Sequence, residues 1–408
     1  MNVFRASDTQ LWRGNLFVLF IAGLLFWCSL ASLLPTLPLY ILSTGASQQQ
    51  IGLVMGSFAI GLLLFRPGLG QLADNKGRKI VLIIGTLVAA IAPLGYLVFK
   101  SIPLLLMWRA FHGISIAAFA TGYTTLVADL APREKRGEII GYMSLVNPIG
   151  MAIGPALGGY LQEGVGSRVL FLVAAELAFV ALLGTIQVTN PPVESEQGNI
   201  ANPKFWQILL SARARVPAVV FLLIGLGFGT LSTFVPLFMK SIQVDLNPGL
   251  FYSTAAIASF SGRVFAGKAS DRLGRGLFIT LSLISYTLSM VVLWQANSAF
   301  TFLLAGLLEG LGGGTLIAMI ATLIADRSVS RERGRMFGLC IAGFDVGIAI
   351  AGPVLGSIAD QVGYRVMFAT SAILSLLALL IFITLCCKDI ASSLRFAFGR
   401  GQDTYALK

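Results

Sequence analysis

Charged residues and histidine are scarce in this chain. Only 12% of its 408 residues are Asp, Glu, Lys or Arg, and one residue is His, whereas soluble domains carry about 25% charged residues. With 56% hydrophobic residues, a water-soluble fold would lack the polar surface that it needs. These proportions exclude a soluble enzyme, a secreted disulfide scaffold and a disordered regulator. A single His gives no basis for a His-rich metal site, so we expect no metal.

Cysteine and nucleotide-binding motifs are equally sparse. The cysteines lie within or beside apolar runs, so structural disulfides are not expected; they are Cys28, Cys340, Cys386 and Cys387. No GxxxxGK[ST] loop is present, which argues against ATP as the energy source. Without a nucleophile and base pair or a metal constellation, we expect neither enzyme activity nor a cofactor.

Long apolar runs are what the chain has in abundance. A membrane-spanning helix takes about 20 residues, and windows of that length predict twelve spans: 15–42, 50–72, 79–99, 102–128, 137–162, 168–189, 216–240, 249–270, 276–295, 299–325, 334–360 and 364–387. We therefore predict an all-α membrane protein. Its expected parts are a cytoplasmic N-terminus (1–14), a six-helix bundle (15–189), a cytoplasmic linker with an interfacial helix (190–215), a second six-helix bundle (216–387) and a cytoplasmic tail (388–408).

The distribution of Lys and Arg predicts the orientation. The chain has 29 Lys and Arg against 18 Asp and Glu, a formal net charge of +11. Most of these cations lie at the termini and in the loops after even-numbered spans, while the opposite loops carry only Lys100, Arg168, Lys240 and Arg365. Positive-inside logic places both termini in the cytoplasm, in a plasma membrane or bacterial inner membrane. The charge indicates topology and contact with membrane lipids, not a nucleic-acid partner, and the basic tail is expected to be solvated or to skim lipid.

An internal repeat relates the two predicted bundles. The residues Gly70, Asp74, Gly77 and Arg78 recur at a constant separation of 197 as Gly267, Asp271, Gly274 and Arg275. The same separation relates Asp129 to Asp326 and Gly113 to Gly310. Two parallel halves of six helices, related by an axis along the membrane normal, are typical of transporters with a substrate cavity between the halves. The repeat therefore favours alternating access by rocking of the halves.

On these residues the chain resembles the major facilitator superfamily, and more narrowly its twelve-helix drug:proton antiporters, over residues 15–387. The superfamily motif after the second helix is matched by Gly70, Asp74, Gly77, Arg78 and Lys79, with Asn75 in place of the usual basic residue. The antiporter motif of the fifth helix, G-x8-G-x3-G-P-x2-G-G, is met in full by Gly141, Gly150, Gly154, Pro155, Gly158 and Gly159. The fourth-helix motif is met by Arg109 and Gly113, with His112 where the family often has Gln.

The resemblance implies two conformational devices. A cytoplasmic latch would hold one transport state closed; its residues are Gly70, Asp74, Gly77, Arg78 and Asp129, repeated as Asp271, Gly274, Arg275 and Asp326. The fifth-helix motif would serve state switching and limit leak. From the residues themselves, glycines at every fourth position form a smooth stripe that lets another helix approach closely. The alternative for the latch is that its Lys and Arg residues only set the orientation in the membrane. The alternative for the glycine stripe is ordinary tight helix packing.

Ionisable side chains inside apolar spans are costly in lipid, so each is a functional candidate. The predicted proton- and substrate-coupling residues are Arg109, His112, Glu309 and Asp345, and Glu176 is a weaker candidate. Arg109 and His112 share a helix face, and the repeat places Glu309 opposite His112, so we predict a charge cluster. The alternative for each is a paired, structural polar group. Arg66 and Arg263 are expected to anchor or support the latch near the cytoplasmic interface.

The function predicted from these features is secondary active transport. We expect export of small amphiphilic compounds by alternating access, driven by a proton gradient, in a monomer. The alternative is a proton-coupled uptake symporter or facilitator for a sugar or organic acid, against which the complete fifth-helix motif argues. A non-transporting receptor on the same scaffold is disfavoured because the charged intramembrane residues are present.

Overall fold

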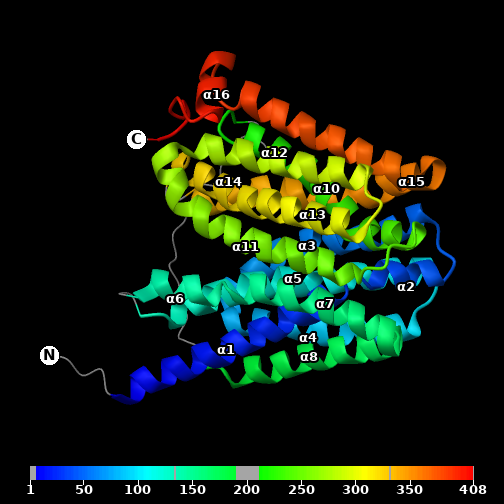
Figure 1. The fold of residues 1–408 in the computed structure, drawn as a ribbon. Helices are drawn as coiled ribbons and strands as arrows, with labels where there is room; N and C mark the ends of the chain where they lie inside the picture. Colours follow the sequence, from blue (N-terminus) through cyan, green and yellow to red (C-terminus); the bar gives the residue numbers. More distant parts are fainter. Residues whose placement is uncertain (1–5, 133–134, 190–210, 330–331, 408) are drawn as a thin grey trace. The chain divides into compact units, whose positions relative to one another are not determined.

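The computed structural model describes residues 6–132, 135–189, 211–329 and 332–407, and the part described is built from helices with no strand (Figure 1). Side chains are described from residue 14 onwards, except those of Lys268 and Asp271. The all-α fold predicted from the apolar runs is confirmed. The predicted interfacial helix of the linker, around Phe205 and Trp206, lies outside the described residues.

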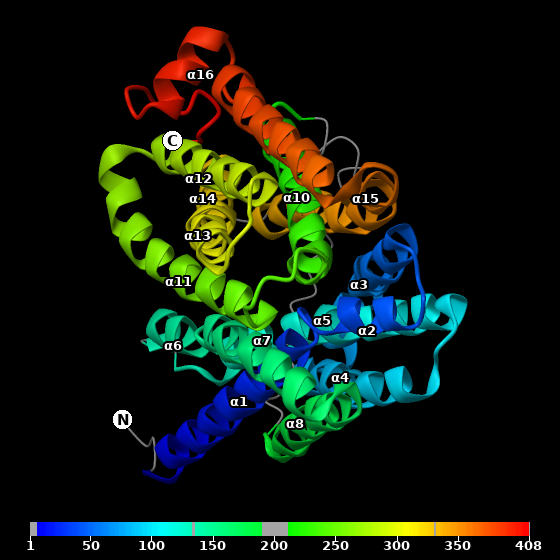
Figure 2. The same ribbon diagram turned by 45° about the vertical axis from the view of Figure 1, so that its right-hand side comes forward.

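The chain forms two compact units, and each is treated by itself. Unit 1 comprises Met1–Tyr40 and Ser57–Gly198. Within its described part, α1 packs against α7 and α8, and α4 packs against α5 and α8 (Figure 2). Its helices are α1 (Ala6–Ser32), most of α2 (Leu37–Ser43), the larger part of α3 (Gln48–Lys76), α4 (Arg78–Val98), α5 (Ile102–Leu130), α6 (Arg136–Met143), α7 (Val146–Val165) and α8 (Ser167–Gln187).

Unit 2 comprises Ile41–Gly56 and Asn199–Lys408. In its described part, α10 packs along α15, α12 packs against α13 and α15, and α11 packs against α13 and η2. Its helices after the linker are α10 (Arg215–Ser241), α11 (Pro248–Leu273), α12 (Arg275–Trp294), α13 (Ala299–Glu309), the π-helix η2 (Gly310–Gly314), α14 (Thr315–Asp326), α15 (Arg333–Leu385) and α16 (Ile390–Ala397).

The helices account for the twelve predicted spans. Ten stretches of the described residues are long and apolar enough to cross a membrane. One of them, α15, runs for 53 residues but has non-helical φ 87° and ψ 169° at Gly363, so it is two helices that meet there. The α11 helix has membrane length at 26 residues but is more polar than the ten. The first span breaks into α1 and α2, and the fifth into α6 and α7.

The internal repeat is visible in the backbone. Gly77 and Gly274 precede α4 and α12 with φ of 98° and 94°. Gly166 and Gly363, related by the same repeat, have φ of 86° and 87°. Such positive φ values are accessible to glycine at little cost and strain other residues. The repeated glycines are therefore explained by four sharp helix-to-helix turns at equivalent places in the two halves.

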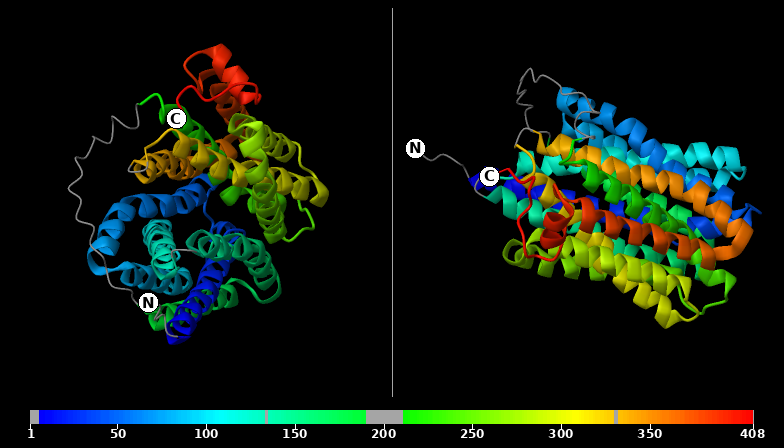
Figure 3. Two further views of the ribbon diagram at one scale, coloured as in Figure 1. Left: turned by 90° about the vertical axis from the view of Figure 1, so that its left-hand side faces the viewer. Right: turned by 90° about the horizontal axis from the view of Figure 1, so that it is seen from above.

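The C-terminal tail is more ordered than a freely solvated end would be. Residues 388–407 include α16, which packs against α12 and α15. Figure 3 (right) shows this red segment running across the direction of the preceding helix. Basic composition alone suggested a solvated tail, but Ser393, Phe396 and Ala397 are buried against unit 2. Much of the tail is thus part of the folded unit.

Candidate functional site

The charged residues predicted to form the first-half latch lie close together, and their role as a latch stays a prediction. Nε of Arg78 lies 3.3 Å from Oδ2 of Asp129, and its Nη1 lies 3.6 Å from Oδ1 of Asp74. Nη1 also donates a hydrogen bond to the Ala73 carbonyl at 2.9 Å. Glycine at position 77 turns the chain so that Arg78 begins α4, while Gly70 lies in α3 with open space beside it. The latch therefore rests on the Arg78 charge.

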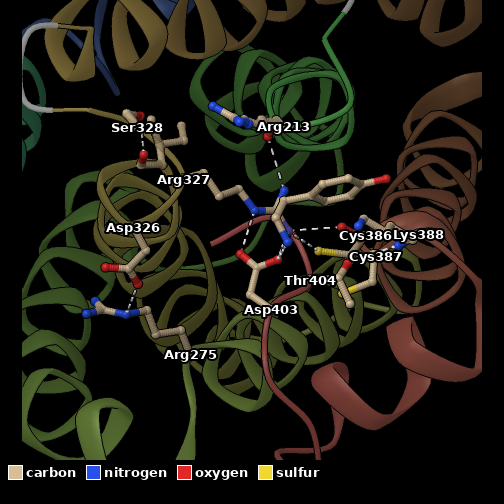
Figure 4. A network of polar contacts seen from close by, with 12 residues as sticks. Arg213, Arg275, Asp326, Arg327, Ser328, Cys386, Cys387, Lys388, Asp403 and Thr404 are labelled. Atoms are coloured by element: carbon tan, nitrogen blue, oxygen red, sulfur yellow. Dashed lines mark hydrogen bonds and ion pairs between the residues drawn. The ribbon is translucent and has the colours of Figure 1, made fainter. Parts of the chain in front are cut away.

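The second-half latch repeats one of these ion pairs. Nε of Arg275, at the start of α12, lies 2.5 Å from Oδ2 of Asp326, at the end of α14 (Figure 4). The side chain of Asp271 is outside the described residues. The Arg275 and Asp326 side chains are 26% and 38% exposed, and partly exposed pairs typically contribute about 0–1 kcal/mol to stability. Breaking such a pair therefore costs little free energy.

The glycine stripe of the fifth-helix motif packs directly on α1. A Cβ added at Gly150 would lie 2.4 Å from Cβ of Trp27, and one at Gly158 would lie 2.1 Å from the Ser32 carbonyl oxygen. A Cβ at Gly154 would lie 2.7 Å from the carbonyl oxygen of Cys28. These separations are shorter than any stable contact, so the close approach of α7 to α1 requires glycine at these positions.

Three other motif residues play different parts. Gly141 lies in α6, apart from the stripe, and a Cβ there would meet nothing within 4 Å. Pro155 and Gly159 lie in α7 and are buried. Proline inside a helix removes one backbone hydrogen bond. The motif thus combines a close-packed stripe with a locally weakened backbone ladder.

Arg109 and His112 form a buried polar network inside unit 1. Nη1 of Arg109 lies 3.1 Å from Nδ1 of His112, and the Tyr96 hydroxyl lies 3.0 Å from the same nitrogen. The Arg109 guanidinium lies 4.4 Å from the centre of the Phe58 ring, and its Nε has no hydrogen-bond partner among the described residues. The Arg109 and His112 residues are only 5% and 1% exposed.

This geometry determines which ring nitrogen of His112 carries the proton. A guanidinium can only donate hydrogen bonds, so Nδ1 of His112 accepts from Arg109 and the ring proton of the neutral tautomer lies on Nε2. A proton on Nδ1 would place two donors face to face. In this arrangement His112 orients the Arg109 charge, and the predicted coupling role of both residues stays a prediction.

Glu309 lies at a backbone irregularity in unit 2. It ends α13, and the next five residues, Gly310–Gly314, form the π-helix η2; such insertions are frequent at functional sites. Glu309 is close enough to Arg263 of α11 for electrostatic interaction. Nε of Arg263 donates a hydrogen bond to the Gly314 carbonyl at 2.9 Å. Arg263 therefore connects α11 to the far end of the π-helix, within electrostatic range of the carboxylate.

Arg263 makes a polar contact with the Gly314 carbonyl that the sequence did not predict. Its position before the motif aspartate suggested an anchor near the interface, and its charge inside a span was the signal for a polar partner. Asp345 is buried in α15, 7% exposed. His112 belongs to unit 1 and Glu309 to unit 2, so the predicted cluster of the two stays a prediction.

A second feature that the sequence did not predict is the buried ion pair of Arg327 with Asp403, which holds the tail and is called the lock below. The Arg327 side chain is fully buried and contacts Asp403 through Nε at 2.6 Å and Nη2 at 2.9 Å (Figure 4). It also donates to the carbonyls of Arg213 and Cys386 at 3.1 and 2.9 Å. Its guanidinium lies 5.3 Å from the centre of the Tyr405 ring. One arginine thus joins the end of the linker, the end of α15 and the tail.

The electrostatics of this lock favour the charged guanidinium. Burial alone lowers the pKa of Arg327, but hydrogen bonding and charge, chiefly from Asp403, more than offset it, so the pKa is raised. The tail also reaches the latch, because the Leu407 backbone N–H donates to the Asp326 carbonyl at 2.8 Å. The lock and the second-half latch are therefore adjacent in sequence and in space.

Metal chemistry has no support in the described part of the chain. No group of three His, Cys, Asp or Glu side chains there could hold a metal ion. The four cysteines are free and buried.

Comparison with known proteins gives consistent matches. The sequence pattern of the Major Facilitator Superfamily matches residues 19–275 and 245–392. The chain is 26% identical over 389 residues to the multidrug resistance protein MdtG of Salmonella typhimurium, covering 90% of this chain and 94% of that protein. It is 27% identical over 373 residues to the multi-drug resistance efflux pump PmrA of Streptococcus pneumoniae, covering 88% and 93%.

Solved structures with the same fold include two transporters. A bacterial homologue of the human lysosomal transporter Spinster, in an inward-facing and unoccupied conformation, matches with a TM-score of 0.77 and 14% identity, over 96% of this chain and 98% of that one. The nucleoside transporter NupG matches with a TM-score of 0.74 and 17% identity, over 90% and 99%. At these identities the likeness extends to the fold alone.

Proposed function

We propose that this chain, which belongs to the Major Facilitator Superfamily, exports small amphiphilic compounds in exchange for protons by alternating access. Membership makes it a multi-pass membrane transporter of a small molecule and not an enzyme. The direction of transport, the proton gradient as energy source and the monomeric state are parts of the proposal. So are the cytoplasmic termini and the location in a plasma membrane or bacterial inner membrane.

The observation that carries proton coupling is the arrangement around Glu309. A carboxylate within a membrane-spanning segment is a functional candidate by default, and this one lies within electrostatic range of a cation, Arg263, that donates a hydrogen bond to the far end of a π-helix. Protonation of Glu309 would remove the charge partner of Arg263. The run Gly310–Gly314 has little side-chain bulk to resist a change of helix register, so the proton would loosen α13 and α14 relative to α11.

Two observations support export over uptake. The relatives MdtG and PmrA are multidrug efflux proteins that align with about nine-tenths of the chain. The fifth-helix stripe is packed on α1 at distances that only glycine permits, as expected for the antiporter motif. A proton-coupled uptake symporter or facilitator for a sugar or organic acid is the second candidate, and the fold it would use is the same.

The test is proton movement in proteoliposomes. Vesicles holding a trapped pH dye and the purified chain are given an imposed pH gradient and a panel of amphiphilic cations, sugars and organic acids. Wild type is compared with Glu309→Gln and Arg263→Gln. The matched control is Glu176→Gln, because Glu176 lies in the membrane-spanning α8 but on an exposed face.

Amphiphile-triggered proton efflux in wild type and Glu176→Gln, absent in Glu309→Gln, is the expected result. Arg263→Gln is expected to bind amphiphiles but to couple them poorly to protons. Proton movement in the same direction as an added sugar or acid would replace export by symport. Equal proton movement in wild type and Glu309→Gln would remove Glu309 from the coupling path.

A further inference from the structure

The short helix α16 has two distinct faces. One face is buried on α12: the Phe396 carbonyl oxygen would lie 2.2 Å from a Cβ added at Gly276, and Oγ1 of Thr280 donates to the Ala397 carbonyl at 3.0 Å. The side chain of Asp389 accepts from the Ser392 backbone N–H at 2.8 Å and caps the helix start. α16 is thus held in a defined orientation, and its other face is presented outwards.

That other face is an apolar stripe. Ile390, Leu394 and Phe398 are 59%, 38% and 53% exposed, and residues four apart lie one above another on a helix. Cations flank the stripe, since Lys388, Arg395 and Arg400 are all exposed. An apolar stripe bordered by cations is the pattern of a helix that lies in a membrane interface.

The position of α16 determines what covers this stripe. The helix begins shortly after the membrane-spanning α15 ends at Leu385 and runs across its direction (Figure 3, right). The two helices on which it packs also expose large apolar side chains, among them Leu281 and Leu288 of α12 and Leu380 of α15. Such exposure is expected where a helix faces lipid. A stripe this close to the end of a membrane-spanning helix is within reach of the lipid headgroups.

We propose that α16 binds the anionic phospholipid surface of the membrane that the chain spans. Ile390, Leu394 and Phe398 insert between the acyl chains, while Lys388, Arg395 and Arg400 pair with headgroup phosphates. The buried Arg327 and Asp403 pair closes the tail behind α16 and holds it against unit 2. The proposal does not depend on which compound is transported.

The test measures the immersion of α16 in the full-length chain. A nitroxide spin label is attached at Leu394→Cys, and at Gln402→Cys as the control on the exposed part of the tail. The native cysteines are buried, so labelled wild type serves as the blank. The chain is placed in nanodiscs of phosphatidylcholine, with or without phosphatidylglycerol. Collision rates with oxygen and with a neutral nickel chelate then report lipid and water access.

In anionic nanodiscs the label at 394 is expected to show an oxygen-to-nickel collision ratio several-fold above that at 402. Each cation near an anionic surface strengthens binding by about 1 kcal/mol, about fivefold. The variant K388Q/R395Q/R400Q, labelled at 394, should therefore lose most of this ratio in anionic nanodiscs. In neutral nanodiscs the variant and the unsubstituted chain should be alike.

Two results would overturn the proposal. Equal nickel access at 394 and 402 in both lipids would mean that the stripe is solvated. Shielding of position 394 from both reagents, independent of lipid and rising with protein concentration, would mean that a second copy or another protein covers it. Unchanged size-exclusion profiles of the labelled variants establish that their folds are intact.

Discussion

The lock between Arg327 and Asp403 gives the sharpest prediction, because both side chains are nearly inaccessible to solvent, at 0% and 7% exposed. Substituting Asp403→Asn keeps the shape but leaves the guanidinium buried without a counter-charge. Breaking a buried ion pair in this way costs about 3–5 kcal/mol. The carbonyls of Arg213 and Cys386 still accept hydrogen bonds from Arg327, so we expect the lower end, about 3 kcal/mol.

The loss of stability in Asp403→Asn can be measured by limited proteolysis as an increase in the rate at which the tail is cleaved. When a segment opens and closes faster than it is cut, the cleavage rate follows the population of the open form. A loss of about 3 kcal/mol raises that population roughly a hundredfold. Trypsin should therefore cut the detergent-solubilised Asp403→Asn chain at Arg395 or Arg400 about a hundred times faster than wild type.

A double-mutant cycle and a neighbouring control separate the ion pair from general damage. Arg327→Gln alone leaves a buried carboxylate, whereas Arg327→Gln with Asp403→Asn removes both charges, so the double variant should cost less than the sum of the single ones. Gln402→Ala, on an exposed side chain, should change cleavage less than twofold. An acceleration below threefold for Asp403→Asn would refute the claim that this pair holds the tail.

Three further predictions concern the helices and the latch. Gly158→Ala places a carbon 2.1 Å from a backbone oxygen of α1 and should lower stability by about 1–3 kcal/mol in thermal unfolding, while Gly141→Ala, in open space, should not destabilise the chain. Tyr96→Phe removes the buried hydroxyl that contacts both His112 and Arg109 and should cost about 1 kcal/mol in the same assay; no change would show that the hydroxyl is dispensable. Asp326→Asn should alter stability by less than about 1 kcal/mol yet impair transport. Exchanging Arg275 and Asp326 should restore that transport, and failure to do so would argue against a charge-based latch.

The fold could be predicted from the sequence because its strongest signal is local. A span needs about 20 apolar residues, and each window of that kind corresponds to helix in the structure. The repeated Gly77 and Gly274 could also be interpreted, since a sharp turn between helices demands glycine. The break of the first span into α1 and α2 was missed, because hydropathy does not register a short apolar turn.

The polar contacts could be predicted from the sequence only where both partners belong to the repeated latch residues. Arg78 with Asp129 is such a case, as is Arg275 with Asp326. The link from Arg263 to the π-helix depends on how α11 is rotated against η2, which no window of sequence contains.

Arg327 was hidden for a different reason. It lies in a loop where cations are expected to set topology, and nothing local distinguishes a buried arginine from an orienting one. Its partner, Asp403, follows it by 76 residues. The signal lay in the repeat, because the position equivalent to Arg327 in the first half is Leu130.

This difference between the halves has a mechanical consequence. The two latches use equivalent residues, yet among the residues that the structure describes only the second adjoins a lock, since Arg327 directly follows Asp326 and the Leu407 N–H donates to the Asp326 carbonyl. A force on the tail therefore reaches the second latch through two short connections. The first latch is followed by an apolar side chain, Leu130, that is unable to form such an ion pair. If α16 binds lipid, the state of the membrane surface acts on the half of the transporter that also contains Glu309 and Arg263.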